Sequence, residues 1–174
     1  ELARKAVAAE PDTAEAIHTL GIIAHPSGNL DEAIEHLRRA VALAPETALY
    51  HANLGEMSRM AGRIGEAIAA GRRALELDPD NPGALSNLGI ALFDQGQFAE
   101  ALGCYERAIA LQPDFALAHS NRGNALQRLK RFAEAEPAYR RALELRPDFA
   151  DGWNNRGTCL RELGRLDEAE SAYG

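Results

Sequence analysis

The sequence predicts an all-α protein, an α-solenoid of antiparallel helix pairs, because four residue columns repeat in one register. Proline recurs every 34 residues, since 45 − 11 = 34 and each later interval is the same. One column of glycine and two of alanine keep that step without an insertion. A fixed period of this length is typical of helical repeat arrays, whose units bury their apolar faces against their neighbours. The columns are Pro11, Pro45, Pro79, Pro113 and Pro147; Gly21, Gly55, Gly89, Gly123 and Gly157; Ala33, Ala67, Ala101, Ala135 and Ala169; and Ala6, Ala40, Ala74, Ala108 and Ala142.

The period divides the chain into a single array over residues 1–174. Residues 1–13 match the end of a preceding repeat, and residues 150–174 form a partial one. The complete repeats are 14–47, 48–81, 82–115 and 116–149. Because both end repeats are incomplete, we expect a window from a longer array, with open ends that could self-associate.

The first half of each repeat predicts a helix that is buried on more than one side, as in residues 116–129. Glycine stands where this helix should end, and it adopts the left-handed conformation without a Cβ penalty. These glycines are Gly28, Gly62, Gly96 and Gly164. Lys130 replaces glycine in the fourth complete repeat, so we expect a more strained turn there. Pro26 is expected to end or kink its helix early.

The second half of each repeat predicts an amphipathic helix, as in residues 98–112, with apolar residues at i, i+3, i+4 and i+7. We expect a glutamate in its first turn and an arginine in its last turns, as the helix dipole favours. The recurring proline should end it. Pro137 is expected in a first turn, where proline costs little. The columns are Glu32, Glu66, Glu100, Glu134 and Glu168, and Arg39, Arg73, Arg107 and Arg141. The arginines could bind an acidic partner, but the net charge of −7 favours simple dipole compensation.

These columns resemble the tetratricopeptide repeat over essentially the whole chain. The Leu-Gly pair of that family is present in Leu20-Gly21, Leu54-Gly55 and Leu88-Gly89. Aromatic residues stand at three of its positions: Trp153; Phe98 and Phe132; and Tyr105, Tyr139 and Tyr173. The resemblance implies a right-handed superhelix whose first helices line a concave groove and whose second helices form the convex face.

Three residues depart from the family pattern. Arg122 and Arg156 replace leucine, and Gly71 replaces the aromatic residue of the second complete repeat. Because a second glycine, Gly65, lies in the same helix, we expect residues 48–81 to be the loosest repeat.

An asparagine column carries the main functional prediction. It occupies one repeat position, which the resemblance places in the concave groove. An asparagine side chain both donates and accepts hydrogen bonds, so a column of them could hold the backbone of an extended peptide. The arrangement resembles the asparagine ladder of protein O-GlcNAc transferases, although each amide could instead bond locally or to water. The candidate peptide-binding residues are Asn53, Asn87, Asn121 and Asn155, with Asn124, Arg59, Phe93, Gln127 and Arg161 nearby.

Other site chemistry has little support in the sequence. His51 and His119 occupy a packing position, and no spacing motif gives His18, His25 or His36 a metal-ligand set. Cys104 and Cys159 are expected to be reduced packing residues. Because no catalytic or cofactor motif is present, we expect a segment without catalytic residues, cofactor or metal.

Composition narrows the class of partner. The acidic balance argues against nucleic acid. No run of 18 apolar residues predicts a membrane span, and the first residues lack the apolar stretch of a secretory signal, which favours a cytoplasmic location. We therefore expect an interaction scaffold for a peptide or partner protein. The alternative is a substrate-recruiting segment of a larger glycosyltransferase similar to the O-GlcNAc transferases.

Overall fold

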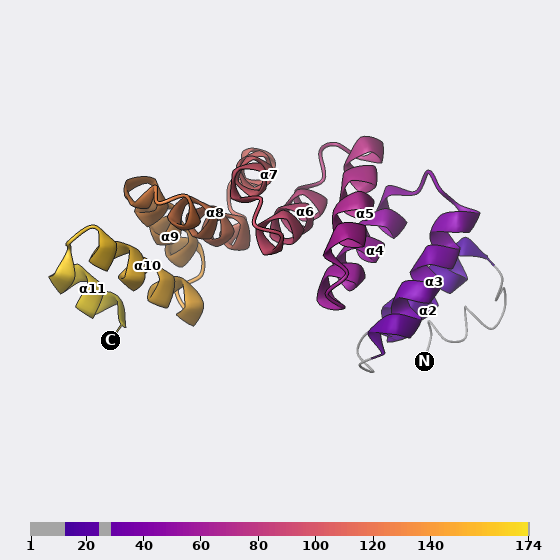
Figure 1. Cartoon of the computed structure of the whole chain (residues 1–174), viewed down its shortest axis with the longest axis horizontal. Helices are drawn as coiled ribbons and strands as arrows, with labels where there is room; N and C mark the ends of the chain where they lie inside the picture. The colour runs from indigo at the N-terminus through magenta and orange to yellow at the C-terminus, as the bar shows by residue number, and fades with distance from the viewer. Residues whose placement is uncertain (1–12, 25–28, 174) are drawn as a thin grey trace. The chain divides into compact units, whose positions relative to one another are not determined.

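The computed structural model describes residues 13–24 and 29–173, and all secondary structure in these residues is helical (Figure 1). The first helices of the repeats are α2 (Ala14–Ala24), α4 (Ala48–Met60), α6 (Pro82–Asp94), α8 (Ala116–Arg128) and α10 (Ala150–Glu162). The second helices are α3 (Leu30–Leu43), α5 (Ile64–Leu77), α7 (Phe98–Leu111), α9 (Phe132–Leu145) and α11 (Leu166–Tyr173). The predicted all-α class is therefore confirmed.

The helices pack as consecutive pairs in two compact units, residues 1–91 and 92–174, whose division falls inside α6. In the first unit α2 packs on α3, and α4 on α5. In the second unit α8 packs on α9, and α10 on α11. The second helices α3, α7 and α9 also contact the first helices that follow them, α4, α8 and α10. Among the described residues, no helix is long and apolar enough to cross a membrane.

Both alanine columns are buried in the helix packing. The first column lies fully inside, from Ala33 and Ala101 at 0% exposure to Ala169 at 4%. The second is equally buried at Ala40, Ala74, Ala108 and Ala142. A small side chain on both sides of a contact lets two helix backbones approach closely, so larger residues are needed only around it. In the first unit Ile34, Leu37, Leu54 and Met57 fill that surrounding space.

The turns between paired helices use the left-handed conformation that the sequence predicts. The φ angles of Gly62, Gly96 and Gly164 are 74°, 85° and 75°. Lys130 takes the same conformation with a φ of 59°, although its Cβ is crowded there. The strained turn expected at Lys130 is confirmed. Gly28, Pro26 and His25 lie outside the described residues.

Two expectations about the second helices are wrong. Pro137 is not in the first turn of α9, because that helix begins at Phe132 and Pro137 is its sixth residue. Its missing N–H therefore leaves the carbonyl of Ala133 without the usual helical partner. The arginine column also lies before the last turn: Arg39 precedes the final four residues of α3, and Arg141 those of α9.

Two arginines of this column form ion pairs. Arg141 binds Glu144 at 3.0 Å, and Arg73 binds both Glu46 and Glu76. All of these side chains are substantially exposed, so solvent screens the pairs and each contributes little to stability. The glutamates are in the first turns as expected.

The arginines that replace leucine face carboxylates. Arg156 on α10 donates through Nε and an NH₂ group to Oε1 of Glu136, at 3.0 and 2.9 Å. Glu136 is only 5% exposed, so this pair lies largely inside the second unit. Arg122 lies 3.5 Å from Glu106. An unpaired carboxylate in the position of Glu136 would be costly, which makes Arg156 a structural requirement of its repeat.

Candidate functional site

The four asparagines of the predicted column occupy one equivalent place in the fold. Each is the sixth residue of a first helix: Asn53 of α4, Asn87 of α6, Asn121 of α8 and Asn155 of α10. All four residues are partly exposed, although the Nδ2 atom of Asn121 is itself buried. Their hydrogen bonds differ, however, and these differences decide what each can bind.

Asn53 is already engaged in the first unit. Its Nδ2 lies 2.7 Å from Nε2 of His18 on α2, and the imidazole stacks on Tyr50 with ring centroids 4.6 Å apart. Burial lowers the pKa of His18, against a smaller opposing effect of Glu15. A neutral imidazole accepts the amide hydrogen at Nε2 and carries its own hydrogen on Nδ1. The Asn53 carbonyl is then the group that remains for a ligand.

Asn87 lies beside a packing defect. Gly71 provides no side chain where the three later repeats have tyrosine, and Leu88 of α6 packs over it instead. A Cβ placed on Gly71 would lie 3.2 Å from Cδ1 of Leu88. The void that remains has a volume of about 10 Å³, which is room for about one water molecule. Asn87 borders this void together with Ala52, Gly55 and Ala84.

Asn155 belongs to a larger network in the second unit. Its Nδ2 donates to Oδ1 of Asn124 on α8 at 3.1 Å. The hydroxyl of Tyr139 on α9 lies 2.9 Å from that same oxygen and 2.9 Å from Oε1 of Gln127. Three of the candidate residues are thus brought together around one phenol.

The Tyr139 ring reaches this network across the position of Gly123. A Cβ on Gly123 would lie only 2.6 Å from Cε1 of Tyr139, so no larger residue fits there without moving the ring. Tyr139 is fully buried, and burial raises the pKa of its phenol. The hydroxyl therefore stays protonated and available as a hydrogen-bond donor.

Asn121 shows an unmet hydrogen-bonding need. Its Nδ2 is buried and has no hydrogen-bond partner in the part of the chain that the structure describes. A buried amide donor without an acceptor costs about 1–3 kcal/mol, so an acceptor that reached this atom, from water or from a ligand, would be favoured. Asn121 is therefore the candidate asparagine whose side-chain donor is left unused by the described residues.

The remaining candidates differ in accessibility. Phe93 packs edge-on against Phe98 at 5.1 Å, and the guanidinium of Arg128 lies 4.2 Å from the Phe98 centroid. This aromatic cluster is therefore partly used within the second unit. Arg161 is exposed on α10, whereas Arg59 is half-buried on α4. The structure thus joins Asn124, Gln127 and Asn155 directly, and leaves Arg161 at the surface.

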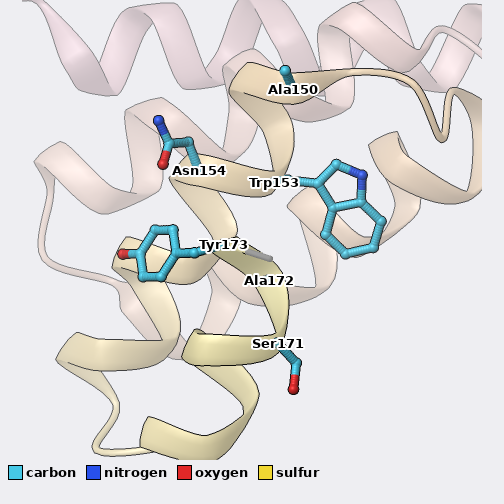
Figure 2. A pocket seen from close by; sticks show the side chains of 6 residues that line it. All are labelled: Ala150, Trp153, Asn154, Ser171, Ala172 and Tyr173. Atoms are coloured by element: carbon cyan, nitrogen blue, oxygen red, sulfur yellow. The ribbon is translucent and has the colours of Figure 1, made fainter.

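A pocket lies between α10 and α11 (Figure 2). Its volume is about 540 Å³, and Trp153, Asn154 and Tyr173 contribute to its lining. The Trp153 indole donates to the Pro147 carbonyl at 2.9 Å, and the Tyr173 hydroxyl lies 3.2 Å from Oγ1 of Thr158. The two aromatic rings in Figure 2 are therefore each anchored by a hydrogen bond.

The histidines at the packing position are structural, as expected. His51 and His119 are each 8% exposed. Their Nε2 atoms lie 2.8 and 3.0 Å from the carbonyls of Pro45 and Pro113. Trp153 makes the same contact one repeat later, so this position anchors the start of a first helix to the preceding proline turn. No group of three or more potential ligands that could hold a metal ion occurs among the described residues.

The cysteines form no disulfide with one another. Cys159 is fully buried, and its thiol donates to the Phe132 carbonyl at 3.3 Å. Burial, together with nearby Glu136, raises the pKa of this thiol to about 11. A thiol that remains protonated is a poor nucleophile, which supports a packing role for Cys159.

The polar roles of His18 and Tyr139 are not predicted from the sequence. The sequence pattern indicates only a possible metal ligand at His18 and a packing residue at Tyr139. A signal for Tyr139 was present, because a buried phenol needs a hydrogen-bond partner and two amides precede it by 12 and 15 residues. No comparable signal marks His18, since its contact with Asn53 spans 35 residues.

Similar folds occur among solved structures. MamA has a TM-score of 0.84 at 23% identity, covering 94% of this chain and 89% of that one. YrrB, described as a TPR protein with an unusual peptide-binding site, has a TM-score of 0.79 at 21% identity, with coverages of 99% and 89%. PilF of Pseudomonas aeruginosa has a TM-score of 0.82 at 25% identity, with coverages of 92% and 73%. No curated protein sequence matches significantly.

The family model of the tetratricopeptide repeat matches residues 18–82, 86–148 and 120–174. Repeats of this family serve as protein-interaction scaffolds and are generally non-catalytic. Together with the helix-pair structure, these matches confirm the family that the sequence columns indicated. The chain belongs to the tetratricopeptide repeat family.

Proposed function

We propose that this chain binds an extended peptide or a partner protein's extended segment along its first helices, through the asparagine column. Within each unit the ligand backbone would lie across the exposed amides, and neighbouring side chains would set preference. An amide can pair with a peptide group whatever the ligand's side chains are. The mode suits a scaffold whose partner is recognised mainly by its backbone.

The observation that carries this proposal is the buried Nδ2 of Asn121, which lacks an acceptor among the described residues. A peptide carbonyl would supply one. Two of the other asparagines have only part of their capacity left, because Asn53 is bonded to His18 and Asn155 to Asn124. The description of YrrB as a peptide-binding TPR protein adds support from fold similarity.

Peptide selection followed by nuclear magnetic resonance tests the proposal. Short unstructured peptides would be selected from a random library against the whole chain, and the strongest binder titrated into labelled protein. We expect the side-chain amide signal of Asn121 to shift most, with smaller shifts at Asn155. Shifts confined to the second helices, or failure to select any binder, would contradict the proposal.

A second candidate is the substrate-recruiting segment of a larger glycosyltransferase resembling the O-GlcNAc transferases. The regular asparagine column favours it, since such a segment would present a protein substrate to a catalytic domain. The full-length gene decides this alternative, because it requires a glycosyltransferase domain in the same protein. Self-association through the ends of the array is a separate proposal, which light scattering against concentration would test.

A further inference from the structure

The buried hydroxyl of Tyr139 can donate only one hydrogen bond, and this restricts the orientations of the amide groups around it. A phenol carries one hydrogen, yet it lies 2.9 Å from amide oxygens of both Asn124 and Gln127. It can donate to only one of them. The other amide must turn its NH₂ group toward the phenol oxygen, which is allowed because amide oxygen and nitrogen occupy equivalent positions.

The bond to Asn155 decides which amide turns. Asn124 Oδ1 already accepts from Asn155 Nδ2, so reversing Asn124 would place two NH₂ groups against each other. Reversing Gln127 disturbs no other bond of the network. The arrangement that keeps the Asn155-to-Asn124 bond as the structure has it therefore runs from Gln127 Nε2 to the Tyr139 oxygen, and from the Tyr139 hydroxyl to Asn124 Oδ1, which also accepts from Asn155.

This chain of hydrogen bonds determines which amide atoms of Asn155 and Asn124 remain free to bind a ligand. Asn155 keeps Oδ1, a hydrogen-bond acceptor, and Asn124 keeps Nδ2, a donor. Neither atom has a further partner in the described part of the chain. A peptide backbone must then present an N–H at Asn155 and a carbonyl at Asn124.

We infer that Tyr139 is a positioning residue which, through Asn124, sets the orientation of Asn155 and thereby the polarity with which a peptide backbone is accepted. The inference rests on the proposed peptide-binding function. Tyr139 itself touches no ligand, since its ring is fully buried between α8 and α9. Only its hydroxyl reaches the amides.

Tyr173 provides a matched control in the same unit. It stands one repeat after Tyr139 and lies over Gly157 in the way that Tyr139 lies over Gly123, with a Cβ-to-ring distance of 2.6 Å in both cases. Its hydroxyl instead faces Thr158, and the side chain is 48% exposed. Loss of this hydroxyl should leave the Asn124 network intact.

The experiment compares Tyr139→Phe and Tyr173→Phe with the wild-type chain. Without ligand, Tyr139→Phe should shift the Asn155 side-chain NH₂ signals and speed their exchange with water, whereas Tyr173→Phe should not. A selected library peptide should bind Tyr139→Phe roughly fivefold more weakly, as expected for one weakened hydrogen bond. In a series of peptides that each have one amide replaced by an ester, the affinities should also differ less from peptide to peptide on this variant than on the wild-type chain.

Two controls separate the possible failures. If Tyr139→Phe leaves the Asn155 signals and the affinity unchanged while Asn121→Ala and Asn155→Ala weaken binding, the inference fails and the proposed function stands. If none of the three weakens binding, the proposed function fails as well. Should Tyr139→Phe not fold, Asn124→Ser breaks the same link from α8, and unchanged Asn155 signals in that variant would overturn the inference.

Discussion

The repeats 48–81 and 116–149 fill the same volume in different ways. In the later repeat, Tyr139 lies over Gly123 and fills the space between paired helices with its own ring. In the earlier one, Gly71 provides no side chain, and Leu88 of the next first helix packs there instead. The comparison teaches that this position must be filled, but either the repeat itself or its successor can fill it. Only the tyrosine also places a hydroxyl beside the amides of Asn124 and Gln127.

The largest expected effect is the loss of the Tyr139 ring. Tyr139→Ala should lower the free energy of unfolding by about 3–5 kcal/mol, because it empties a fully buried aromatic site. Tyr173→Ala, at a half-exposed site over an equivalent glycine, should cost clearly less. Urea denaturation measures both. Equal costs would show that the buried ring is not what holds the later repeat together.

Breaking the buried ion pair between Glu136 and Arg156 should give the next largest loss of stability. Glu136→Ala leaves Arg156, which is only 18% exposed, without its main partner and should cost about 3 kcal/mol, the lower end for breaking a buried pair. The matched change in the first unit, Glu66→Ala, removes a more exposed partner of Arg38 and should cost at most about 1 kcal/mol. A larger loss for Glu66→Ala in the same denaturation series would reverse the comparison.

A smaller contrast comes from adding one methyl group in each repeat. Gly123→Ala places a Cβ 2.6–2.8 Å from atoms of a buried ring and should cost roughly 1–3 kcal/mol. Gly71→Ala meets Leu88 at 3.2–3.3 Å and should cost less. Thermal unfolding of the two variants gives the order directly. If Gly71→Ala were the more damaging, Leu88 would be the tighter filling of the two.

The turn at Lys130 should show the smallest stability effect. Lys130→Gly relieves a left-handed φ of 59° and should stabilise the chain by roughly 1 kcal/mol, less the entropy that glycine adds to the unfolded state. Gly96→Ala, at a φ of 85°, should destabilise it. A Lys130→Gly variant that melts below wild type would show that the turn is not strained.

The first unit should also respond to pH through His18. Since burial lowers the folded-state pKa of His18, its neutral form stabilises the fold fully above the ordinary histidine value, and that contribution is lost as the pH falls through and below 6.5. Nuclear magnetic resonance titration should place the His18 midpoint below 6.5. A midpoint above that value would mean that the charged form is favoured, against the observed bond to Asn53.

The repeat columns predicted most of the fold because they encode local geometry and close backbone contact. Glycine at Gly62 and Gly96 indicates a left-handed turn, and buried alanine such as Ala101 marks a helix contact. The residues at which the helices begin and end were harder to predict from the columns, so Pro137 lies deeper inside its helix than expected.

The hydrogen bonding of the candidate site could be predicted only in part, because the residues that bond to one another are far apart in sequence. The asparagine column could be read from a single repeat position. The partners that distinguish its members, His18 for Asn53 and the Tyr139 network for Asn155, come from other helices. A pattern of residue types predicts which helix face a side chain occupies, but not which hydrogen bonds are already satisfied there.

The most direct test of the account is the affinity of a selected peptide for the wild-type chain and for the Asn87→Ala/Asn121→Ala double variant, measured by calorimetry. If the asparagine column holds the peptide, the double variant should bind at least tenfold more weakly, since two backbone hydrogen bonds are lost, each contributing about 1 kcal/mol. Its melting temperature should stay close to that of the wild type. Unchanged affinity in a folded double variant would contradict the claim that the asparagine column holds the ligand.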